Sequence, residues 1–264
     1  MQNRFRIVIP ARYGASRLPG KPLLDIAGKT LLARVWEQAS ASAAGEVVVA
    51  TDDERVLAHC RDIGADAVLT RAHHQSGTDR VAEVAATRGW APDSVIVNLQ
   101  GDEPCMPSSL IDQLARALLR DAAVPMATLA TPITDAKALF DPHTVKVVTA
   151  ASGAALYFSR APVPWHRDEF LGDRAKLPTG TTFLRHIGLY AYRVGFLARF
   201  VGWPPAPLET AESLEQLRVL WHGERIHVEI AQTPPGPGVD TEDDVRAVLA
   251  WLGENARGGQ PGAS

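Results

Sequence analysis

The sequence predicts an α/β fold with a mainly parallel sheet, helices on both faces and a β-rich extension. Three observations lead to this prediction. Apolar, β-branched runs alternate with amphipathic stretches through the first half of the chain, the second half is less regular, and 264 residues can bury a substantial core. Such alternation implies right-handed β–α–β crossovers between parallel strands. Because no linker or internal repeat interrupts residues 1–252, we expect one domain of Rossmann-like type.

The regular half of the chain supplies most of the expected sheet. Predicted strands, read from the apolar runs, lie at 7–10, 47–50, 67–69, 95–99 and 126–130. Predicted helices, read from the amphipathic stretches, lie at about 30–43, 53–63, 78–89 and 107–120. The order of these segments is that of a sheet covered by helices on both faces.

The second half of the sequence predicts further strands that extend the sheet, not another β–α–β crossover unit. Two apolar runs at 145–149 and 155–158 flank Ser152-Gly153, which is typical of a hairpin. Residues 161–183 contain three prolines and many charges, so we expect a long loop. The regular pattern then returns as a strand at 187–194, a helix at 210–221, a strand at 226–231 and a helix at 241–252. Residues 253–264 are rich in Gly and Ala and predict a disordered tail.

Composition excludes several classes of protein. The net charge of -3 provides no basic field for nucleic acid. No apolar run approaches the ~20 residues that cross a bilayer, and a strand begins too early to leave room for a signal peptide. Two cysteines, Cys60 and Cys105, indicate a reducing compartment without a disulfide framework. We therefore expect a cytoplasmic protein that binds neither membrane nor nucleic acid.

A basic loop follows the first predicted strand. It combines three cations, Arg12, Arg17 and Lys21, with Gly14 and Gly20, so backbone amides and positive charge can both face a phosphate group. Ligands of open α/β sheets lie beyond the carboxyl ends of the strands, which is where this loop begins. It matches neither GxxxxGK[ST] nor GxGxxG. We interpret it as a site for a nucleoside triphosphate; the alternative is a surface turn with solvated charges.

Two acidic residues are candidate ligands for a hard cation. Asp102 follows the strand predicted at 95–99, and its carboxylate is expected at the same sheet edge as the basic loop. Asp240 precedes the last predicted helix. Mg²⁺ commonly binds one or two carboxylates together with substrate phosphates and water. The alternatives are that Asp102 only stabilises its own turn and that Asp240 or Thr241 caps the helix. Sequence spacing does not show whether the two carboxylates meet.

The basic loop resembles the signature loop of the CMP-sugar synthetases, and most closely that of the branch acting on Kdo (3-deoxy-manno-octulosonate). The resemblance extends from residue 5 to about residue 250 in the family's order. One departure is Gly14-Ala15-Ser16, where the family commonly has a hydroxyl at the middle position. The further motifs that carry it are VATD (49–52), TRAHHQSGTDR (70–80), VNLQGDEP (97–104), VKVV (145–148), ALYFSR (155–160), LRHIGLY (184–190), LEQLR (214–218) and GVDT (238–241).

The resemblance implies a function for the whole chain. It implies an Mg²⁺-dependent cytidylyltransferase that joins CTP and Kdo into CMP-Kdo, releases pyrophosphate, and serves lipopolysaccharide biosynthesis. It also implies a sheet of the nucleotide-diphospho-sugar transferase type and a homodimer. The irregular segment at about 145–200, with its aromatic residues, is the expected dimerisation region.

The resemblance also implies roles for individual residues. Arg12, Lys21, Asp102 and Asp240 are expected to be catalytic, with Asp102 and Asp240 as the metal ligands. Nucleotide contacts are expected from Arg12, Arg17, Lys21, Gln75, Ser76, Gly77 and Arg80. Sugar contacts are expected from Gln100, Arg160, His186, Tyr190, Glu209 and Gln216, with Arg185 as a further candidate. Structural alternatives stand beside three of these: Ser76 or Thr78 as a helix cap, and His186 and Tyr190 as core residues.

Other functions fit part of the pattern. A cytidylyltransferase for a related acid sugar, such as 8-amino-Kdo or a sialic acid, is the nearest alternative. A glycosyltransferase that consumes a nucleotide sugar usually carries an Asp-x-Asp motif, whereas Asp102 here is followed by Glu103-Pro104. A noncatalytic nucleotide-binding subunit would bind CTP without turnover. The triphosphate loop favours synthesis of a nucleotide sugar over its consumption.

Overall fold

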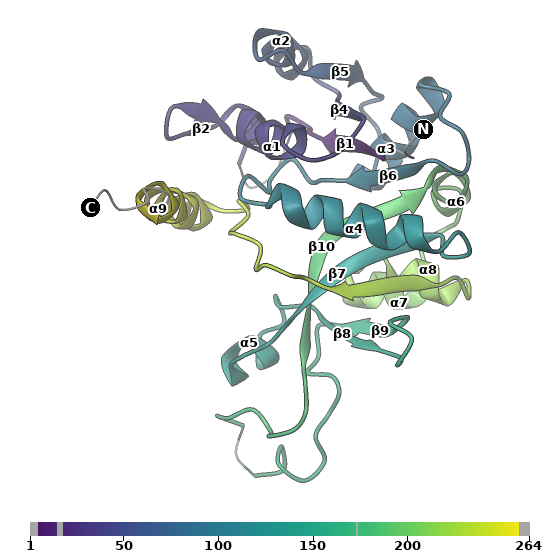
Figure 1. Ribbon diagram of the computed structural model, residues 1–264, viewed down its shortest axis with the longest axis vertical. Helices are drawn as coiled ribbons and strands as arrows, with labels where there is room; N and C mark the ends of the chain where they lie inside the picture. Colours follow the sequence, from purple (N-terminus) through teal and green to yellow (C-terminus); the bar gives the residue numbers. More distant parts are fainter. Residues whose placement is uncertain (1–4, 15–17, 173, 259–264) are drawn as a thin grey trace.

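A twisted sheet runs through the molecule and carries helices on both faces (Figure 1). The structure is a computed structural model and describes residues 5–14, 18–172 and 174–258, with side chains as far as residue 254. Over these residues the main sheet has nine strands, of which seven follow the order β11-β7-β10-β6-β1-β4-β5, while β8 and β9 extend it beside β10. Its strands are β1 (Arg6–Pro10), β4 (Glu46–Thr51), β5 (Asp66–Leu69), β6 (Val95–Asn98), β7 (Met126–Pro132), β8 (Lys146–Thr149), β9 (Ala155–Ser159), β10 (Leu184–Arg193) and β11 (Ile226–Ile230).

Pairing along this order is parallel except at one strand. β1 pairs in parallel with β4 and β6, β4 with β5, and β7 with β11. β10 runs antiparallel between β6 and β7, with Tyr190 opposite both Asn98 and Thr128. The mainly parallel sheet is confirmed, and the predicted hairpin is confirmed as β8 and β9, which pair antiparallel.

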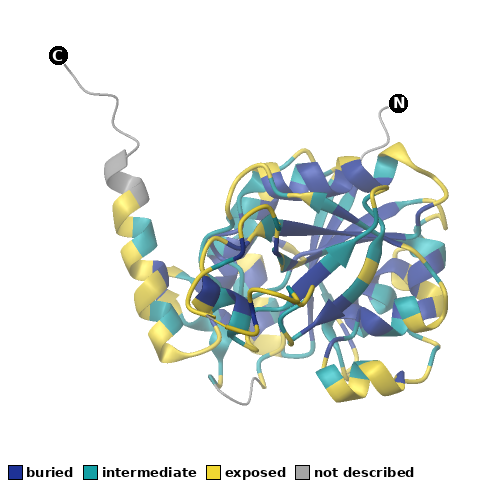
Figure 2. Cartoon of the chain, turned by 90° about the horizontal axis from the view of Figure 1, so that it is seen from below, coloured by how far each residue is buried: buried dark blue, intermediate teal, exposed yellow. Residues whose placement is uncertain are grey.

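Helices pack on the two faces because the strand residues alternate. Ile7 and Ile9 are fully buried in a core with residues of α1, α2 and α4, whereas Val8 faces a second core with residues of α3 and α6. Figure 2 shows the buried sheet between its two covering layers. The helices are α1 (Leu31–Ser40), α2 (Glu54–Asp62), α3 (Gly77–Thr87), α4 (Ser108–Arg120), α5 (Ala136–Phe140), α6 (Val194–Phe200), α7 (Pro207–Glu212), α8 (Leu217–Trp221) and α9 (Glu242–Gly258).

Side-chain caps fix where several helices begin. Thr30 accepts a hydrogen bond from the amide of Ala33 at α1, and Asp53 accepts one from the amide of Arg55 at α2. These caps satisfy backbone donors that the first turn leaves unpaired. None of the helices that the structure describes has the length and apolar character needed to cross a bilayer.

Some predicted elements differ in their bounds. The helix predicted at 210–221 is divided into α7 and α8, because Ser213 adopts a left-handed conformation with φ of 51° that a helix does not accommodate. The strand predicted at 187–194 begins at Leu184 and gives way to α6 at Val194. The predicted tail is wrong for residues 253–258, which continue α9; residues 259–264 lie outside the described residues.

Several short elements were not predicted. The basic loop leads into the 3-10 helix η1 (Lys21–Leu23) and a small hairpin of β2 (Asp25–Ile26) and β3 (Lys29–Thr30). α5 precedes the hairpin of β8 and β9. Residues 161–172 and 174–183 belong to the predicted long loop, which extends below the sheet in Figure 1 and packs Phe170 and Phe183 with Ile133 and Leu139.

Candidate active site

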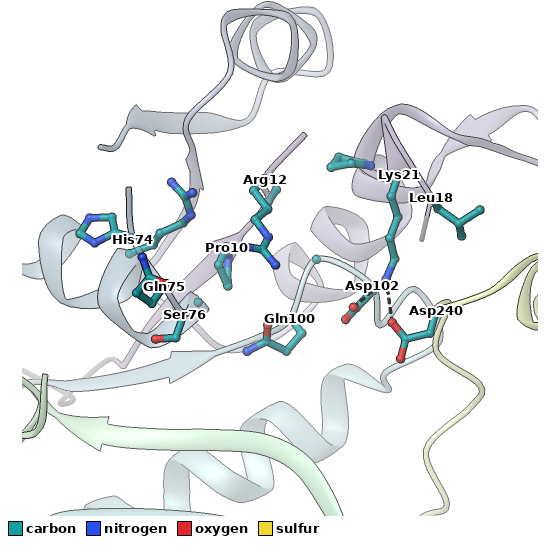
Figure 3. A pocket seen from close by; sticks show the side chains of 15 residues that line it. Pro10, Arg12, Leu18, Lys21, His74, Gln75, Ser76, Gln100, Asp102 and Asp240 are labelled. Carbon is teal, nitrogen blue, oxygen red and sulfur yellow. Dashed lines mark hydrogen bonds and ion pairs between the residues drawn. The ribbon is translucent and has the colours of Figure 1, made fainter. Parts of the chain in front are cut away.

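A cavity of about 400 Å³ opens at the carboxyl ends of β1 and β6 (Figure 3). Its wall is built from four segments that are distant in the sequence: the basic loop, the entrance to α3, the turn after β6, and the residue before α9. It lies where parallel strands of an open α/β sheet commonly present their ligands. The lining includes Arg12, Leu18, Lys21, Gln75, Ser76, Gly77, Arg80, Gln100, Asp102 and Asp240.

One ammonium group joins the two predicted metal ligands. Lys21 Nζ lies 2.8 Å from Asp102 Oδ2 and 3.1 Å from Asp240 Oδ1. The Lys21 side chain is only 12 % exposed, whereas that of Asp240 is 66 % exposed. Burial lowers the pKa of Lys21, but the charges and hydrogen bonds of Asp102 and Asp240 outweigh it and leave the pKa raised. Lys21 therefore stays charged between the two carboxylates.

Backbone contacts bring Asp240 to Asp102. The amide of Gly236 donates to the carbonyl of Cys105, over a distance of 3.2 Å, as this segment crosses the turn that carries Asp102. A Cβ on Gly236 would lie 2.4 Å from Cys105 Cβ, so a side chain there would push the two segments apart. Gly101 is equally confined, because its Cβ would lie 2.7 Å from the carbonyl oxygen of Pro10. These glycines permit the close approach that assembles the acidic pair.

The carboxylate of Asp240 does not cap α9. That role belongs to Thr241 together with Asp244, a residue of the first turn whose Oδ2 accepts hydrogen bonds from the amides of Asp240 and Thr241 at 2.9 and 2.8 Å. The Thr241 side chain completes this arrangement by accepting from the amide of Asp244 at 3.3 Å. The capping alternative therefore holds for Thr241 and Asp244, and the carboxylate of Asp240 points toward Lys21.

The acidic pair suits a hard divalent cation. Burial first, then the charges of Asp102 and Asp240, raise the pKa of the neighbouring Glu103 to about 7, while the charges of Lys21 and Arg185 oppose this shift. Among the described residues no group of three or more His, Cys, Asp or Glu side chains is arranged to hold a metal. Mg²⁺ is usually bound by one or two carboxylates, with substrate oxygens and water completing its coordination. Asp102 and Asp240 fit this kind of site better than one in which the protein supplies every ligand.

The predicted nucleotide residues gather around the same cavity. Arg12 is exposed and forms no ion pair or hydrogen bond within the part of the chain that the structure describes, so its charge is available to a ligand. Gly77 packs closely on Pro10 and Gln100. Ser76 caps α3 through a reciprocal capping box with Asp79, which confirms the cap reading without removing Ser76 from the cavity wall. Arg17 lies outside the described residues.

Arg80 lines the cavity but its guanidinium is already engaged. Arg80 is 2 % exposed and donates to Asp52 Oδ2 at 2.5 Å and to Thr70 Oγ1 at 2.6 Å. It ties α3 to the segment after β4 and to the segment after β5. The Arg80 side chain therefore stabilises the cavity wall, and a direct hydrogen bond from Arg80 to the nucleotide would have to replace its bonds to Asp52 and Thr70.

Most of the predicted sugar residues lie outside this cavity. The Arg160 guanidinium donates to backbone carbonyls, the nearest being that of Glu212 at 2.6 Å. Glu209 forms two hydrogen bonds with Arg218, at 2.5 and 2.8 Å. Both side chains are therefore committed to structural bonds, and Arg185 is exposed on β10. His186 and Tyr190 share a ring contact on β10, with centroids 5.3 Å apart.

His186 is held in the neutral form. Its Nε2 lies 3.0 Å from Thr128 Oγ1, and burial lowers the pKa of His186 to about 3. An edge contact with Phe158 covers the ring further. This environment supports the structural alternative for the histidine, while Tyr190, opposite Asn98, borders the polar groups described next.

A buried polar cluster continues from the cavity toward Gln216. Gln100 Nε2 donates to Asn98 Oδ1 at 3.1 Å, and Thr78 Oγ1 donates to Glu215 Oε2 at 2.6 Å. Asn98 and Gln216 are at most 4 % exposed, yet Asn98 Nδ2 and Gln216 Nε2 have no hydrogen-bond partner among the residues that the structure describes. Unpaired buried donors are costly and rare, so they indicate groups awaiting a ligand or water. We define Thr78, Asn98, Glu215 and Gln216 as the inner polar cluster.

Sequence reasoning missed Asn98 and Glu215 as site residues. Both stand beside residues that it selected, Glu215 next to Gln216 and Asn98 two before Gln100. The available signal for Asn98 was a polar residue between apolar Val97 and Leu99 of a buried strand, whereas Glu215 lies between Leu214 and the polar Gln216 and gave no such signal. Burial raises the pKa of Glu215, an effect that only the packed structure reveals.

Comparison with known proteins places this geometry in a family. A family model described as "Cytidylyltransferase" matches residues 6–226. A 3-deoxy-manno-octulosonate cytidylyltransferase of Pseudomonas fluorescens (strain Pf-5) is 56 % identical over 252 residues, which cover 96 % of this chain and 99 % of the relative. The chain belongs to the 3-deoxy-manno-octulosonate cytidylyltransferase family. A relative with the same name in Idiomarina loihiensis is 54 % identical over 95 % of this chain and 99 % of its own.

Solved structures agree with membership of the 3-deoxy-manno-octulosonate cytidylyltransferase family. A CMP:2-keto-3-deoxy-manno-octonic acid synthetase complexed with CTP superposes with a TM-score of 0.87 at 42 % identity, covering 96 % of this chain and 99 % of that one. A 4-diphosphocytidyl-2C-methyl-D-erythritol synthase has a TM-score of 0.61 at 17 % identity, covering 94 % and 98 %, which shows a shared fold.

Proposed function

We propose that this protein transfers the CMP group of CTP to Kdo, forming CMP-Kdo and pyrophosphate for lipopolysaccharide biosynthesis. The observation that carries the proposal is the meeting of the basic loop with two carboxylates in one cavity, in a chain of this family. Cations of the loop suit a triphosphate, and the carboxylates suit the divalent cation that accompanies it.

The reaction needs little covalent chemistry from the protein. The anomeric C2 hydroxyl of Kdo attacks the α-phosphorus of CTP, and the bond to the bridging oxygen breaks as pyrophosphate leaves. Arg12 and Lys21 offset the charge that accumulates on the phosphate oxygens, and the cavity wall holds the two substrates in line. The hydroxyl proton is released to water, and we assign no side chain as its dedicated base.

We propose Mg²⁺ as the cofactor, held by Asp102 and Asp240. When bound, the ion supplies charge neutralisation at the phosphates and lowers the pKa of a hydroxyl that contacts it. The Lys21 ammonium lies between the same two carboxylates and compensates their charge. Its long side chain can turn toward the triphosphate while remaining in the cavity.

We propose that the acceptor sugar lies toward the inner polar cluster. Kdo carries many hydroxyls and one carboxylate, so its site needs neutral donors and acceptors in number. Gln216 Nε2 and Asn98 Nδ2 are buried donors without partners in the described part of the chain, and Gln100 connects Asn98 with the cavity. Tyr190 borders this cluster through its pairing with Asn98.

We also propose a cytoplasmic homodimer formed through the extension at about 145–200. Leu156 and Leu171 there are 61 and 77 % exposed, and Trp165 is 46 % exposed. Apolar side chains exposed in this way favour burial against a second copy. Both cysteines are free and buried, which suits a reducing compartment. Light scattering at micromolar concentration tests the dimer, and a monomer there would remove it.

Pyrophosphate release is the experiment that tests the reaction. The protein is given CTP and Mg²⁺ with Kdo, a sialic acid or a hexose 1-phosphate as acceptor, and each reaction is repeated with EDTA. We expect release with Kdo alone, and its loss with EDTA. Release with another acceptor would reassign the sugar. If none of the three acceptors gave pyrophosphate release although the protein bound CTP, a glycosyltransferase or a noncatalytic nucleotide-binding subunit would be favoured.

A further inference from the structure

Two residues of the inner polar cluster, Glu215 and Gln216, lie on a bent segment between two short helices. We call residues 207–221, which comprise α7, α8 and the turn between them, the α7–α8 corner. It carries Glu215 and Gln216 into the site. Ser213 at its bend has φ of 51°, a conformation that residues other than glycine rarely keep unless their surroundings hold them. Something outside the corner must therefore fix its shape.

Glu212 provides the contact that fixes it. Its Oε1 accepts a hydrogen bond from Ser159 Oγ at 2.7 Å, and its Oε2 accepts one from the amide of Arg160 at 2.9 Å. Ser159 and Arg160 stand at the end of β9. The guanidinium of Arg160 returns to the corner, donating to the carbonyls of Glu212 and Ser213 at 2.6 and 3.4 Å. Both sides of the bend are thereby attached to the sheet extension.

The end of β9 is itself immobilised from the other side. Lys146 is fully buried, and its Nζ donates to the carbonyl of Arg160 at 2.5 Å. The same ammonium donates to the carbonyls of Thr144 and Asp141, at 2.5 and 2.9 Å. A buried charge with three carbonyl acceptors holds those backbone segments together. Glu212 therefore anchors the corner to a rigid support.

A second tether connects the corner with the nucleotide side. Glu215 accepts from Thr78 Oγ1, and Thr78 belongs to the first turn of α3, where Ser76 and Gly77 line the cavity. Gln216 follows Glu215 and is buried with an unpaired donor. Its place relative to bound CTP is thus set by two attachments, Glu212 on the hairpin and Glu215 on α3.

We propose that Glu212 is a positioning residue for the acceptor sugar, acting through the α7–α8 corner that carries Glu215 and Gln216. This inference rests on the proposed function for the identity of the sugar. It does not place Glu212 in contact with either substrate. Losing the Glu212 anchor leaves the basic loop and Asp102 in place, because neither contacts the corner in the part of the chain that the structure describes, and leaves the hydrogen bond between Glu215 and Thr78 of α3. Gln216 is then held by one attachment instead of two, so its contact with the sugar is weakened more than the contacts with CTP.

Glu212→Ala is the variant that tests the proposal, with Glu224→Ala as its matched control. Glu224 is a glutamate beyond the end of the α7–α8 corner, and its carboxylate is paired with Arg199 at 2.7 Å. We expect Glu212→Ala to raise the KM for Kdo about tenfold, equivalent to the loss of one good hydrogen bond, while the KM for CTP stays within twofold. Glu224→Ala should leave both values unchanged.

Hydrogen exchange gives a readout that does not depend on turnover. In Glu212→Ala the amides of Leu217, Arg218 and Val219, which bond within the corner, should exchange faster, whereas amides of α4 should not. Ser159→Ala should act in the same direction, and the double variant should show less than the sum of the two effects because they share one anchor.

The outcomes separate this proposal from the proposed function. An equal rise in the KM of both substrates, or unchanged exchange in the corner, would overturn the positioning role. Wild-type protein that binds CTP but does not use Kdo would instead overturn the proposed function and, with it, the sugar assigned here. In that case faster exchange in Glu212→Ala would still establish the anchor itself.

Discussion

The amide of Val239 donates a 2.8 Å hydrogen bond to the carbonyl oxygen of Asp102. This one contact joins the turn after β6 to the segment before α9, and so places two carboxylates from distant parts of the chain around Lys21. The distance between those carboxylates is therefore a property of backbone packing. Substitutions that alter the packing and substitutions that alter the charges should have separable effects.

Asp240→Asn should abolish most turnover without lowering stability. The carboxylate of Asp240 contacts Lys21 and takes no part in capping α9. We expect turnover to fall by about a hundredfold or more, as for the loss of an electrostatic group at a phosphoryl-transfer site. Asp244→Ala is the contrasting variant: it removes the acceptor of the cap, which is worth about 1 kcal/mol, so it should melt earlier and keep its activity. Melting temperature and pyrophosphate release measure the two effects, and normal activity in Asp240→Asn would contradict a metal role.

Lys21→Ala should weaken CTP binding and turnover together. The variant removes the cation that compensates Asp102 and Asp240 and that we propose to contact the triphosphate. Titration calorimetry with CTP and the rate of pyrophosphate release should both show losses of about tenfold or greater. Lys29→Ala is the control, because Lys29 is exposed and paired with Glu37. An unchanged rate in Lys21→Ala would mean that the basic loop does not act on the phosphates.

Gly236→Ala should disturb the acidic pair through geometry alone. The new Cβ would lie 2.4 Å from Cys105 Cβ and 2.9 Å from the carbonyl of Cys105, so one of the two segments must move. Moving the 236–240 segment carries Asp240 away from Lys21. We expect a higher Mg²⁺ concentration for half-maximal activity and a stability loss of about 1–3 kcal/mol from overpacking. Gly253→Ala, at a glycine of α9 with nothing within 4 Å, should change neither. If Gly236→Ala needed the same Mg²⁺ concentration as wild type, the position of the 236–240 segment would not affect the cation site.

Gln216→Leu should separate binding from stability. The amide nitrogen of Gln216 is buried without a partner, and replacing it with an apolar group removes that desolvation cost. Unfolding in urea should therefore show equal or greater stability. The KM for Kdo should rise about tenfold, since a sugar hydroxyl would lose its donor. A variant that is less stable and binds Kdo normally would show that water, not substrate, satisfies Gln216.

Glu103→Gln should change how stability depends on pH. Burial and the neighbouring aspartates raise the pKa of Glu103 from 4.5 to about 7 in the folded state. The contribution of the protonated group is therefore fully present below pH 4.5 and is lost as the pH rises toward 7. Gln cannot ionise, so the variant should gain stability relative to wild type between these values. Urea unfolding at pH 4.5 and pH 8 measures the difference, and a difference that does not change with pH would contradict the assignment.

The sequence predicted the strands and the nucleotide side of the site for the same reason. The basic loop and Asp102 follow apolar runs directly, and parallel strands deliver their following residues to one edge of the sheet. The meeting of Asp240 with this pair required the packing of Gly236 on Cys105, which no local pattern contains. Its assignment as a ligand came from family resemblance alone.

The acceptor side was harder to predict because it depends on a bend. The sequence pattern predicts a single helix at 210–221 and does not reveal the left-handed conformation of Ser213. The bend at Ser213 decides which glutamate faces the inner polar cluster. Glu209 pairs with Arg218 while Glu215 enters the inner polar cluster. Arg160 likewise looked available for a carboxylate, and only the folded chain shows that carbonyls surround it.

The antiparallel strand β10 has a consequence for the order in which the molecule can assemble. β10 separates β6 from β7, and it is synthesised after both. Until residue 193 has emerged, the main sheet consists of β6-β1-β4-β5, the hairpin of β8 and β9, and β7 without a paired strand. Each of these has an open edge of unpaired amides and carbonyls, and such edges promote association between chains. A protein truncated before β10 should therefore aggregate instead of folding as a smaller nucleotide-binding unit, and a nascent chain should depend on chaperones until its central strand is inserted.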